Sequence, residues 1–320
     1  MRRHEIGTDL STVSDVFSKD LPPVLEVDAG DVVVVHTLDA AGNLERHAAP
    51  GVASRLLLPE RQGHCLCGPI AVRGATAGSA LSVHVRELRT DTWGWTVTAG
   101  RDDVLNRRLG VADLAAHPTL WDLDPDAMVG TNELGFSVDI RPFLGVIGLA
   151  PAAPGEHSTT PPRREGGNID CRELVAGSTL YLPVAVPGGL LSVGDGHAAQ
   201  GDGEVAGTAI ECAMTTELVL DVEPNPVLPT PYARTPAGRV TFGFDADLNE
   251  ASGAALDAML TWMQLDLALD RPAALTLASV AVSLRVTQVA NQVWGVHALL
   301  PDGALSRGTE AAATSPPQRR

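Results

Sequence analysis

The fold is decided by the stretch from Leu180 to Val222, LYLPVAVPGGLLSVGDGHAAQGDGEVAGTAIECAMTTELVLDV. Its two ends, residues 180–193 and 204–222, place apolar and β-branched residues at frequent intervals, which is typical of strands. Between them, residues 194–204 are rich in glycine and suit neither a helix nor a strand. The stretch therefore predicts two strands that hold a polar loop.

The same pattern of short, strand-like segments separated by turn residues extends over most of the chain. There are 32 glycines and 23 prolines, and most segments between them are short and alternate apolar with other residues. An Ala-Gly-Asp or Ala-Gly-Ser tripeptide leads into three such runs, at residues 29–31, 77–79 and 176–178. These features predict a mainly β protein, a sandwich or a barrel. Residues 68–88 are expected to form a hairpin that turns at residues 75–78.

Helical signals are confined to the C-terminal third. A helix is expected to begin after Asp247, where Asp247 and Glu250 fit a capping box, and Pro272 suits the start of a second short helix. Residues 284–301 return to strand character, whereas residues 100–135 have no clear period and are expected to leave the sheet, as a lid. We therefore expect an N-terminal extension at 1–24, a β-sandwich core with the polar site at 25–223, an α/β portion packed on it at 224–304 and a disordered tail at 305–320.

The charge balance excludes several classes of partner. The chain of 320 residues carries 39 acidic against 23 basic side chains, a formal net charge of −16. Nucleic acid and anionic membrane surfaces require the opposite sign, and no apolar stretch approaches the length of a membrane span. No hydrophobic segment follows the basic residues at the start, so no secretory signal is expected. We expect a cytoplasmic protein that binds neither nucleic acid nor membrane.

The loop at residues 194–204, GDGHAAQGDGE, concentrates titratable groups. Asp195, His197, Asp202 and Glu204 lie within eleven residues, and the glycines between them allow the tight turns that would bring them together. Oxygen and nitrogen donors of this kind suit zinc, manganese or calcium. The alternative is a loop that calcium merely stabilises, or one that is only rich in turns.

Further polar residues accompany this loop and can reach a shared pocket. Asn168 and Asp170 stand beside paired glycines, Asp39 follows an apolar strand, and His64 precedes a Gly-Pro turn. A divalent ion among such groups lowers the pKa of a bound water and polarises a carbonyl oxygen, which suits hydrolysis of an amide. A nucleophilic serine is not indicated, because no Gly-x-Ser-x-Gly motif occurs.

The segment from Gly145 to Glu211 closely resembles the signature region of the acetamidase/formamidase family. Upstream, HCLCGPIAVRGATAGSALSVHV at 64–85 resembles the family's His-x-Leu-x-Gly-Pro region, and VDAGDVVVVHTLDAAGN at 27–43 resembles its opening strand. The closing segment at 277–301 is also similar, although Ser283 stands where the family usually has an aspartate.

This resemblance, which covers residues 25–301 with gaps, implies both a fold and an activity. The implied fold is a CUB-like β-sandwich with a smaller α/β portion in the C-terminal third. The implied activity is that of an amidohydrolase that releases ammonia from small aliphatic amides, formamide or acetamide. The resemblance also implies a divalent metal, with zinc preferred over calcium. We further expect a homo-oligomer, because small metabolic hydrolases often associate.

The resemblance assigns roles to the polar residues. The expected metal ligands are Asp170, Asp195, His197 and His64. The expected catalytic residues are Glu204, Asp195 and Asn168: Glu204 would carry a proton from the attacking water to the departing nitrogen, and Asn168 or a backbone N–H would stabilise the oxyanion. The expected substrate contacts are Asp39, Gln200 and Asp202.

Two alternatives remain open at this point. One is a non-catalytic β-sandwich that uses the same loop to bind calcium and a polar ligand such as a sugar, because one fold hosts many functions. The other is a hydrolase of a larger amide, whose pocket residues 100–135 would shape.

Overall fold

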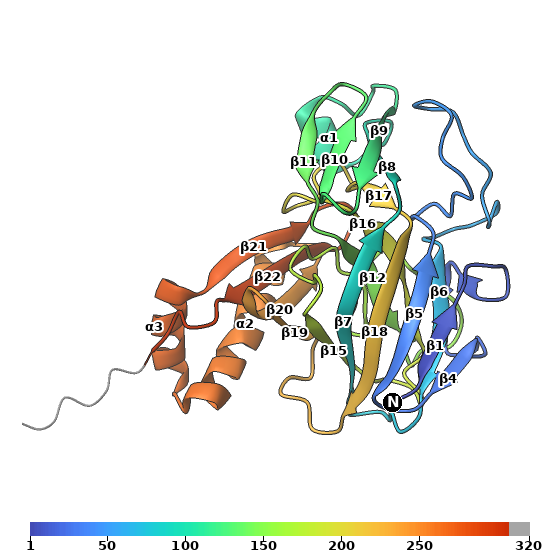
Figure 1. Ribbon diagram of the computed structural model, residues 1–320. Helices are drawn as coiled ribbons and strands as arrows, with labels where there is room; N and C mark the ends of the chain where they lie inside the picture. The colour runs from blue at the N-terminus through green and yellow to red at the C-terminus, as the bar shows by residue number, and fades with distance from the viewer. Residues whose placement is uncertain (307–320) are drawn as a thin grey trace, which may run out of the picture.

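The computed structural model describes residues 1–306, and strands predominate in it (Figure 1). They form two large sheets, one of nine strands and one of eleven. Apolar side chains from both sheets meet in one core, for example Val33 and Leu218 from the first sheet and Ile147 and Val193 from the second. The prediction of a mainly β protein with a helical C-terminal portion is confirmed.

The nine-stranded sheet joins the two ends of the described chain. Its strands pair antiparallel, except that β1 runs parallel to β5. The order across it is β1 (Arg3–Ile6), β5 (Asp31–Thr37), β18 (Met214–Glu223), β7 (Ala80–Thr90), β15 (Thr179–Pro183), β19 (Tyr232–Thr235), β20 (Gly238–Asp245), β22 (Trp294–Leu300) and β21 (Ser283–Gln288). Residues 1–24, expected as an extension, thus supply an edge strand of this sheet.

The eleven-stranded sheet carries the polar region. Its main path is β11 (Ser137–Asp139), β10 (Val129–Asn132), β9 (His117–Asp124), β8 (Trp93–Thr98), β17 (Glu211–Cys212), β16 (Leu191–His197), β12 (Phe143–Leu149) and β14 (Gly166–Asn168). Beside β16 lies β6 (Leu66–Val72), which also pairs with β2 (Val13–Ser14) and β4 (Leu25–Val27). A separate small pair consists of β3 (Val16–Phe17) and β13 (His157–Ser158).

The three Ala-Gly tripeptides are turns that feed one sheet. Gly30, Gly78 and Gly177 adopt φ values of 86°, 97° and 90°, which glycine reaches without steric cost. They precede β5, β7 and β15, which all belong to the nine-stranded sheet.

The hairpin predicted for residues 68–88 is wrong. β6 pairs with β16 in the eleven-stranded sheet, whereas β7 pairs with β18 and β15 in the nine-stranded sheet. The turn between β6 and β7 therefore carries the chain from one layer of the sandwich to the other. Apolar alternation indicates that a segment is a strand, but it does not indicate which strand becomes its neighbour.

Residues 100–135 do not leave the sheet as predicted. After the short helix α1 (Val104–Leu109), β9 and β10 pair in sequence with β8 and extend the eleven-stranded sheet, at the top of Figure 1. Their period is hard to read because both faces of this extension are partly exposed. A lid role for this extension remains a prediction.

The C-terminal third continues the nine-stranded sheet and adds two helices. Asp247 caps α2 (Leu248–Leu267), and Asp270 caps α3 (Arg271–Ala281), which has Pro272 in its first turn, so both predicted helix starts are confirmed. No described helix combines the length and the apolar character that crossing a membrane requires. Of the tail predicted at 305–320, residues 307–320 lie outside the described residues.

Gly243 on β20 allows α2 to pack on the sheet, and its replacement gives a test of this fold. A Cβ there would lie 2.0 Å from the Ala251 carbonyl oxygen and 2.7 Å from the Ala255 nitrogen, both backbone atoms. We expect Gly243→Ala to lower the free energy of unfolding by about 3 kcal/mol, because the helix must shift.

The matched control for Gly243→Ala is Gly253→Ala on the exposed face of α2. A Cβ at Gly253 meets nothing within 4 Å. This change should raise the free energy of unfolding by about 0.5–1 kcal/mol through helix propensity. Urea denaturation measures both changes, and equal effects of the two would contradict the packing described here.

Candidate metal centre and active site

The polar stretch predicted as a loop begins as a strand. β16 ends at His197 and pairs with β12 on one side and with β6 and β17 on the other. A Cβ on Gly196 would lie 2.6 Å from the Cys212 carbonyl oxygen, so this glycine lets β17 approach closely. Asp195 and His197 are therefore fixed by the sheet, and only residues 198–204 form the loop.

His197 lies at the centre of the site and is 1% exposed. Its Nε2 is 3.4 Å from Asp195 Oδ1 and 3.3 Å from Glu211 Oε1. The ring packs edge-on against Phe143, with ring centroids 5.0 Å apart. The imidazole is thus held rigidly between two carboxyl groups.

Gln200 orients His197 instead of lying in the chamber as a substrate contact. Its amide nitrogen donates to the Asp170 carbonyl oxygen at 2.7 Å, so its Oε1 is left to accept from His197 Nδ1 at 2.9 Å. Nδ1 therefore carries a proton, and Nε2 faces the carboxyl groups. Burial lowers the pKa of the ring, but the nearby Glu211 and Asp195 carboxyl groups raise it well above its usual value. With Nδ1 held in this way, Nε2 is the nitrogen that the ring offers to a metal ion.

Glu211 is a site residue that the sequence interpretation missed. It begins β17, it is 2% exposed, and its Oε1 accepts the Ala209 N–H at 2.9 Å. Ligand atoms of His197, Glu204 and Glu211 all lie within 4.8 Å of one another. The sequence signal that could have identified Glu211 is its position inside the apolar run AIECAM. A charged group in a buried strand requires a partner, so its presence there indicates a site.

A second group of potential ligands shares the same imidazole. Atoms of Asp170, Asp195 and His197 also lie within 4.8 Å of one another. Asp170 follows β14, next to β12, and its Oδ1 is 4.0 Å from His197 Nδ1. The structure thus brings together Asp170, Asp195, His197 and Glu204, as predicted from two separate segments of sequence.

The surroundings shift the pKa values of these carboxyl groups in opposite directions. Burial raises the pKa of Glu204 and of Glu211 to about 8 each. Burial acts the same way on Asp195, but the two neighbouring imidazoles hold its pKa below the ordinary value. Burial and the nearby Glu204 raise the pKa of Asp170. The histidines alone therefore carry too little positive charge for all of these groups to be ionised at neutral pH.

The backbone is strained at three of the acids. Asp170, Asp195 and Glu204 have φ values of 53°, 57° and 44°, in the left-handed region. Each such residue costs of the order of 1–3 kcal/mol, and strain of this kind gathers at functional sites. The fold therefore holds these carboxyl groups in place at the expense of stability.

The donor set fits a divalent cation. Several buried atoms have no hydrogen-bond partner within residues 1–306: both carboxyl oxygens of Asp170, Nε2 of His197, Oε2 of Glu204 and Oε2 of Glu211. Gly145 on β12 leaves room beside them, because a Cβ there would lie 2.6 Å from Asp195 Oδ2 and 2.7 Å from Asp170 Oδ1. Acceptor atoms that converge without donors are what a metal ion requires.

His64 and Asn168 lie at the edge of this cluster. His64 Nε2 is 4.0 Å from Asp195 Oδ2, its Nδ1 bonds Thr159 Oγ1 at 2.9 Å, and burial lowers the pKa of its ring. Asn168 donates its amide N–H to the Thr160 carbonyl oxygen at 3.0 Å, while its Oδ1 is buried without a partner. Asn168 Oδ1 is therefore an unpartnered acceptor beside the cluster, and the oxyanion role of the Asn168 amide remains a prediction.

Asp39 and Asp202, predicted to contact substrate, have other partners. Asp39 accepts the Asn43 N–H at 3.0 Å and the Trp95 indole N–H at 2.9 Å. Asp202 accepts from Arg285 Nε at 2.6 Å. Both carboxylates are engaged within the protein, and neither lines the chamber described next.

A chamber of about 90 Å³ opens onto the cluster, with His64, Asn168, Asp195, Glu204 and Glu211 in its wall. It holds roughly three water molecules at about 30 Å³ each, so a molecule the size of formamide or acetamide fits. A larger hollow, here called the vestibule, has a volume of about 810 Å³. The chamber and the vestibule share Arg101, Thr160, Ala290 and Asn291 in their walls.

The sequence profile described as "Acetamidase/Formamidase family" matches residues 4–158 and 152–232. The chain belongs to this family. The match includes both segments that supply the cluster, around Asp170 and around His197.

Relatives of this acetamidase/formamidase family member include curated and structurally solved proteins. The chain is 26% identical over 243 residues to the formamidase of Methylophilus methylotrophus, which is 58% of each chain. It superposes on a crystal structure of acetamidase from Bacillus halodurans with a TM-score of 0.81 at 26% identity, covering 94% of this chain and 97% of that one. For an acetamidase from Yersinia enterocolitica the TM-score is 0.83 at 24% identity, with coverage of 95% and 93%, which supports the fold alone. The alignments with the curated formamidases span only 58% of their length.

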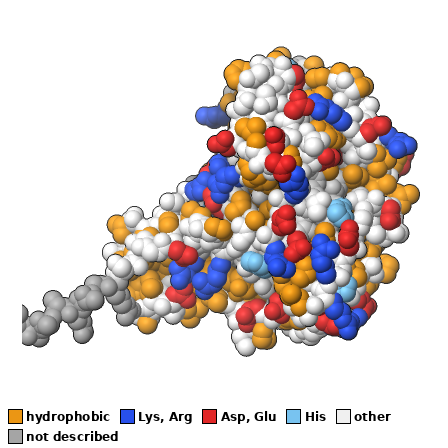
Figure 2. All heavy atoms as spheres, in the orientation of Figure 1, with side chains coloured by type: hydrophobic (Ala, Val, Ile, Leu, Met, Phe, Trp, Pro, Cys, Tyr) orange, Lys and Arg blue, Asp and Glu red, His pale blue; other side chains and the backbone are white. Residues whose placement is uncertain are grey.

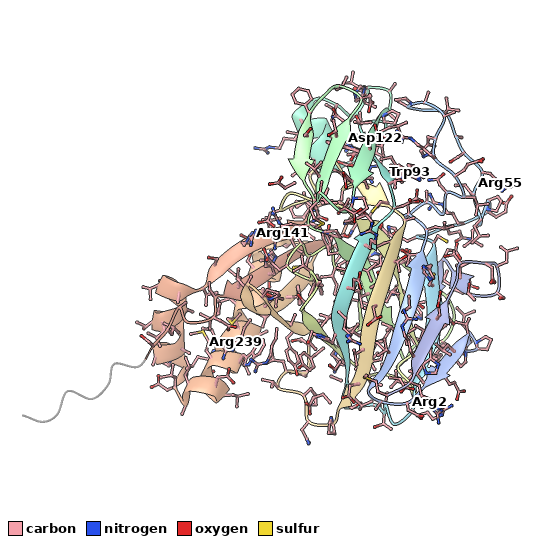
Figure 3. The ribbon with its side chains drawn as sticks, viewed as in Figure 1. Arg2, Arg55, Trp93, Asp122, Arg141 and Arg239 are labelled. Atoms are coloured by element: carbon pink, nitrogen blue, oxygen red, sulfur yellow. The ribbon has the colours of Figure 1, made fainter. Side chains whose placement is uncertain are left out.

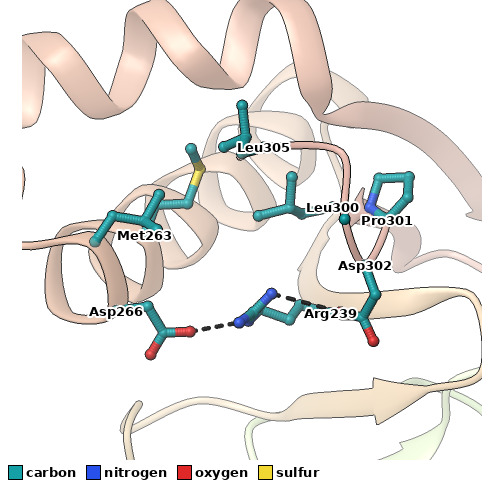
Figure 4. A pocket seen from close by; sticks show the side chains of 9 residues that line it. Arg239, Met263, Asp266, Leu300, Pro301, Asp302 and Leu305 are labelled. Carbon is teal, nitrogen blue, oxygen red and sulfur yellow. Dashed lines mark hydrogen bonds and ion pairs between the residues drawn. The ribbon is translucent and has the colours of Figure 1, made fainter. Parts of the chain in front are cut away.

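Another hollow of this acetamidase/formamidase family member lies beside α2 (Figure 4). Arg239 stands in it between Asp266, at 2.9 Å, and Asp302, at 3.5 Å. Figure 3 places Arg239 among the C-terminal elements, away from Trp93 at the start of β8. Among the described residues that line this hollow, Arg239 is the only cation, and it is already paired with two carboxylates.

Proposed function

We propose that this chain is an amidase that releases ammonia from small linear amides such as formamide or acetamide. The observation that carries the proposal is the buried cluster of unpartnered acceptor atoms around His197, at the end of a chamber sized for a small amide. Membership of a family whose relatives are named formamidase and acetamidase supports it.

The cluster would hold a divalent cation through Asp170, Asp195 and His197, with Glu204 and Glu211 within reach of the same imidazole. When bound, such an ion lowers the pKa of a coordinated water and polarises the amide carbonyl. The imidazole nitrogen favours zinc, because calcium takes oxygen ligands. Calcium is the second candidate, since the other donors are carboxyl oxygens.

The protein's own residues would position the amide and move protons. Glu204 lines the chamber, and its Oε2 has no partner within residues 1–306. This oxygen would accept a proton from the attacking water and then donate it to the departing nitrogen. Asn168 Oδ1 would accept an N–H of the substrate amide. Gln200 keeps the proton of His197 on Nδ1, so the imidazole stays aimed at the cluster.

The proposal predicts ammonia release by the purified, metal-loaded protein. Formamide, acetamide and longer amides would be compared in an ammonia assay, alongside the melting temperature with and without calcium. We expect ammonia from formamide or acetamide. Stabilisation by calcium without ammonia from any amide would instead establish a non-catalytic binding protein and would refute the proposal.

The partner assignments follow the chemistry of the site. A small amide is the proposed ligand, and Figure 2 shows acidic and basic side chains interspersed over the face that it draws, without a basic field of the kind that nucleic acid requires. A cytoplasmic location and a homo-oligomeric state remain predictions.

A further inference from the structure

The junction between the chamber and the vestibule, here called the mouth, is formed by the residues that line both hollows. It carries a cation that the proposed hydrolysis does not use. Arg101 lines both the chamber and the vestibule, and it is the only Arg or Lys that does so among the described residues. Within residues 1–306, its guanidinium makes a single hydrogen bond, from Nη2 to the Ala206 carbonyl oxygen at 3.2 Å. Gly207 gives it space, since a Cβ there would lie 1.5 Å from that same nitrogen.

The acids next to Arg101 do not neutralise it. Asp102 pairs with the Arg107 guanidinium, with Nη2 to Oδ2 at 2.8 Å. Asp103 caps α1 by accepting the Asn106 N–H at 2.8 Å and the Asn106 side-chain amide at 3.0 Å. The fold thus assigns both neighbouring carboxylates to other partners and leaves the Arg101 guanidinium open to an outside acceptor.

A second donor without an acceptor lies in the same walls. Asn291 uses its Oδ1 to accept the Val293 N–H at 2.8 Å, while its Nδ2 is buried and has no partner within residues 1–306. Like Arg101, Asn291 lines both hollows. The cluster presents acceptors, whereas the mouth presents donors, so the mouth is built to hold an oxygen-rich, negatively charged group.

We propose that Arg101, together with the Asn291 amide, binds a carboxylate at the far end of the substrate's acyl chain, so that monoamides of short dicarboxylic acids are preferred substrates. This inference rests on the proposed amidase function. The amide end fits the chamber, and the tail leaves it past Arg101 into the vestibule. The tail must be on the acyl side, because the nitrogen of a primary amide leaves as ammonia.

The reaction itself is unchanged by the tail. One water adds to the amide carbon, the C–N bond breaks, and the products are a dicarboxylate and ammonium. In a chain with a net charge of −16, an anionic substrate needs a local cation to reach a site lined by carboxyl groups. Arg101 lies at the mouth of the chamber, where its positive charge offsets the repulsion between the substrate carboxylate and the carboxyl groups of the site.

The test compares kcat/KM for succinamate and for butyramide, measured by ammonia release with metal-loaded protein. We expect the wild type to prefer succinamate about tenfold or more, and Arg101→Gln to lower the succinamate-to-butyramide ratio about tenfold or more, since charge-assisted hydrogen bonds are lost. The matched control is Arg108→Gln, an exposed arginine on α1 that lines neither hollow, and it should keep the wild-type ratio.

The possible failures are distinguishable. Turnover of acetamide with equal ratios in the wild type and Arg101→Gln, or with a wild-type preference for butyramide, overturns the role of Arg101 and leaves the amidase function standing. If no amide releases ammonia, both proposals fall. Restoration of part of the ratio by Arg101→Lys would support a charge-based role, and a ratio for Arg101→Lys as low as that for Arg101→Gln would contradict it.

Discussion

Replacing Asp195 with asparagine is expected to lower kcat/KM for formamide about 10³-fold, the size of effect seen when a catalytic group is removed. Asp195 faces His197 Nε2 at 3.4 Å through one oxygen and His64 Nε2 at 4.0 Å through the other. Asparagine keeps the shape of the side chain but removes its charge and one acceptor. We therefore expect the bound metal, measured by elemental analysis, to fall together with ammonia release.

The control for Asp195→Asn is Asp221→Asn, the same substitution at an exposed aspartate on β18. In the described part of the chain, the Asp221 carboxylate accepts one hydrogen bond, from the Val222 N–H at 2.8 Å. Its replacement should leave activity and metal content at the wild-type level. Wild-type activity of Asp195→Asn would remove this residue from the catalytic and metal-binding roles assigned to it.

Gly145→Ala is expected to lower kcat/KM for formamide about 10²-fold or more, because a displacement of about 1 Å among reacting groups has that effect. The new Cβ would lie 2.6 Å from Asp195 Oδ2, 2.7 Å from Asp170 Oδ1 and 2.8 Å from His197 Cε1. Gly145 lies in the middle of the buried strand β12, so the backbone cannot move aside. The ligand atoms must move instead.

Gly201→Ala serves as the matched control, since it changes a glycine of the same polar stretch at which a Cβ meets nothing within 4 Å. Metal content, ammonia release and melting temperature would be measured for both variants. We expect Gly201→Ala to resemble the wild type. Full activity and metal content in Gly145→Ala would show that the space beside the acids is not needed.

The fold class and the helix starts could be predicted because their signals are local. Asp247 and Asp270 cap α2 and α3 through their own sequence neighbours, and glycines such as Gly78 mark turns through their backbone freedom. Strand pairing is not local. β6 and β7 are consecutive strands, yet they lie in opposite layers. β6 pairs with the earlier strands β2 and β4 and with the distant β16, whereas β7 pairs with β15 and β18, more than 90 positions further along the chain.

The site residues divide in the same way, into those with a local sequence signal and those that only the fold brings together. Asp195, His197 and Glu204 were found because glycine and charge are concentrated in one stretch of sequence. Glu211 was missed because it is a single carboxyl group in an apolar strand, and only the pairing of β17 with β16 brings it to His197. Gln200 was expected to contact substrate, but its role depends on a carbonyl oxygen thirty residues earlier, that of Asp170.

The central claim is that the buried cluster around His197 is a divalent-metal site required for amide hydrolysis. The most direct test measures metal content and ammonia release from formamide in the same samples, before chelation, after exhaustive chelation, and after zinc or calcium is added back. We predict that chelation abolishes ammonia release and that one of the two ions restores it in proportion to the metal bound. Full activity in protein freed of metal would contradict the claim.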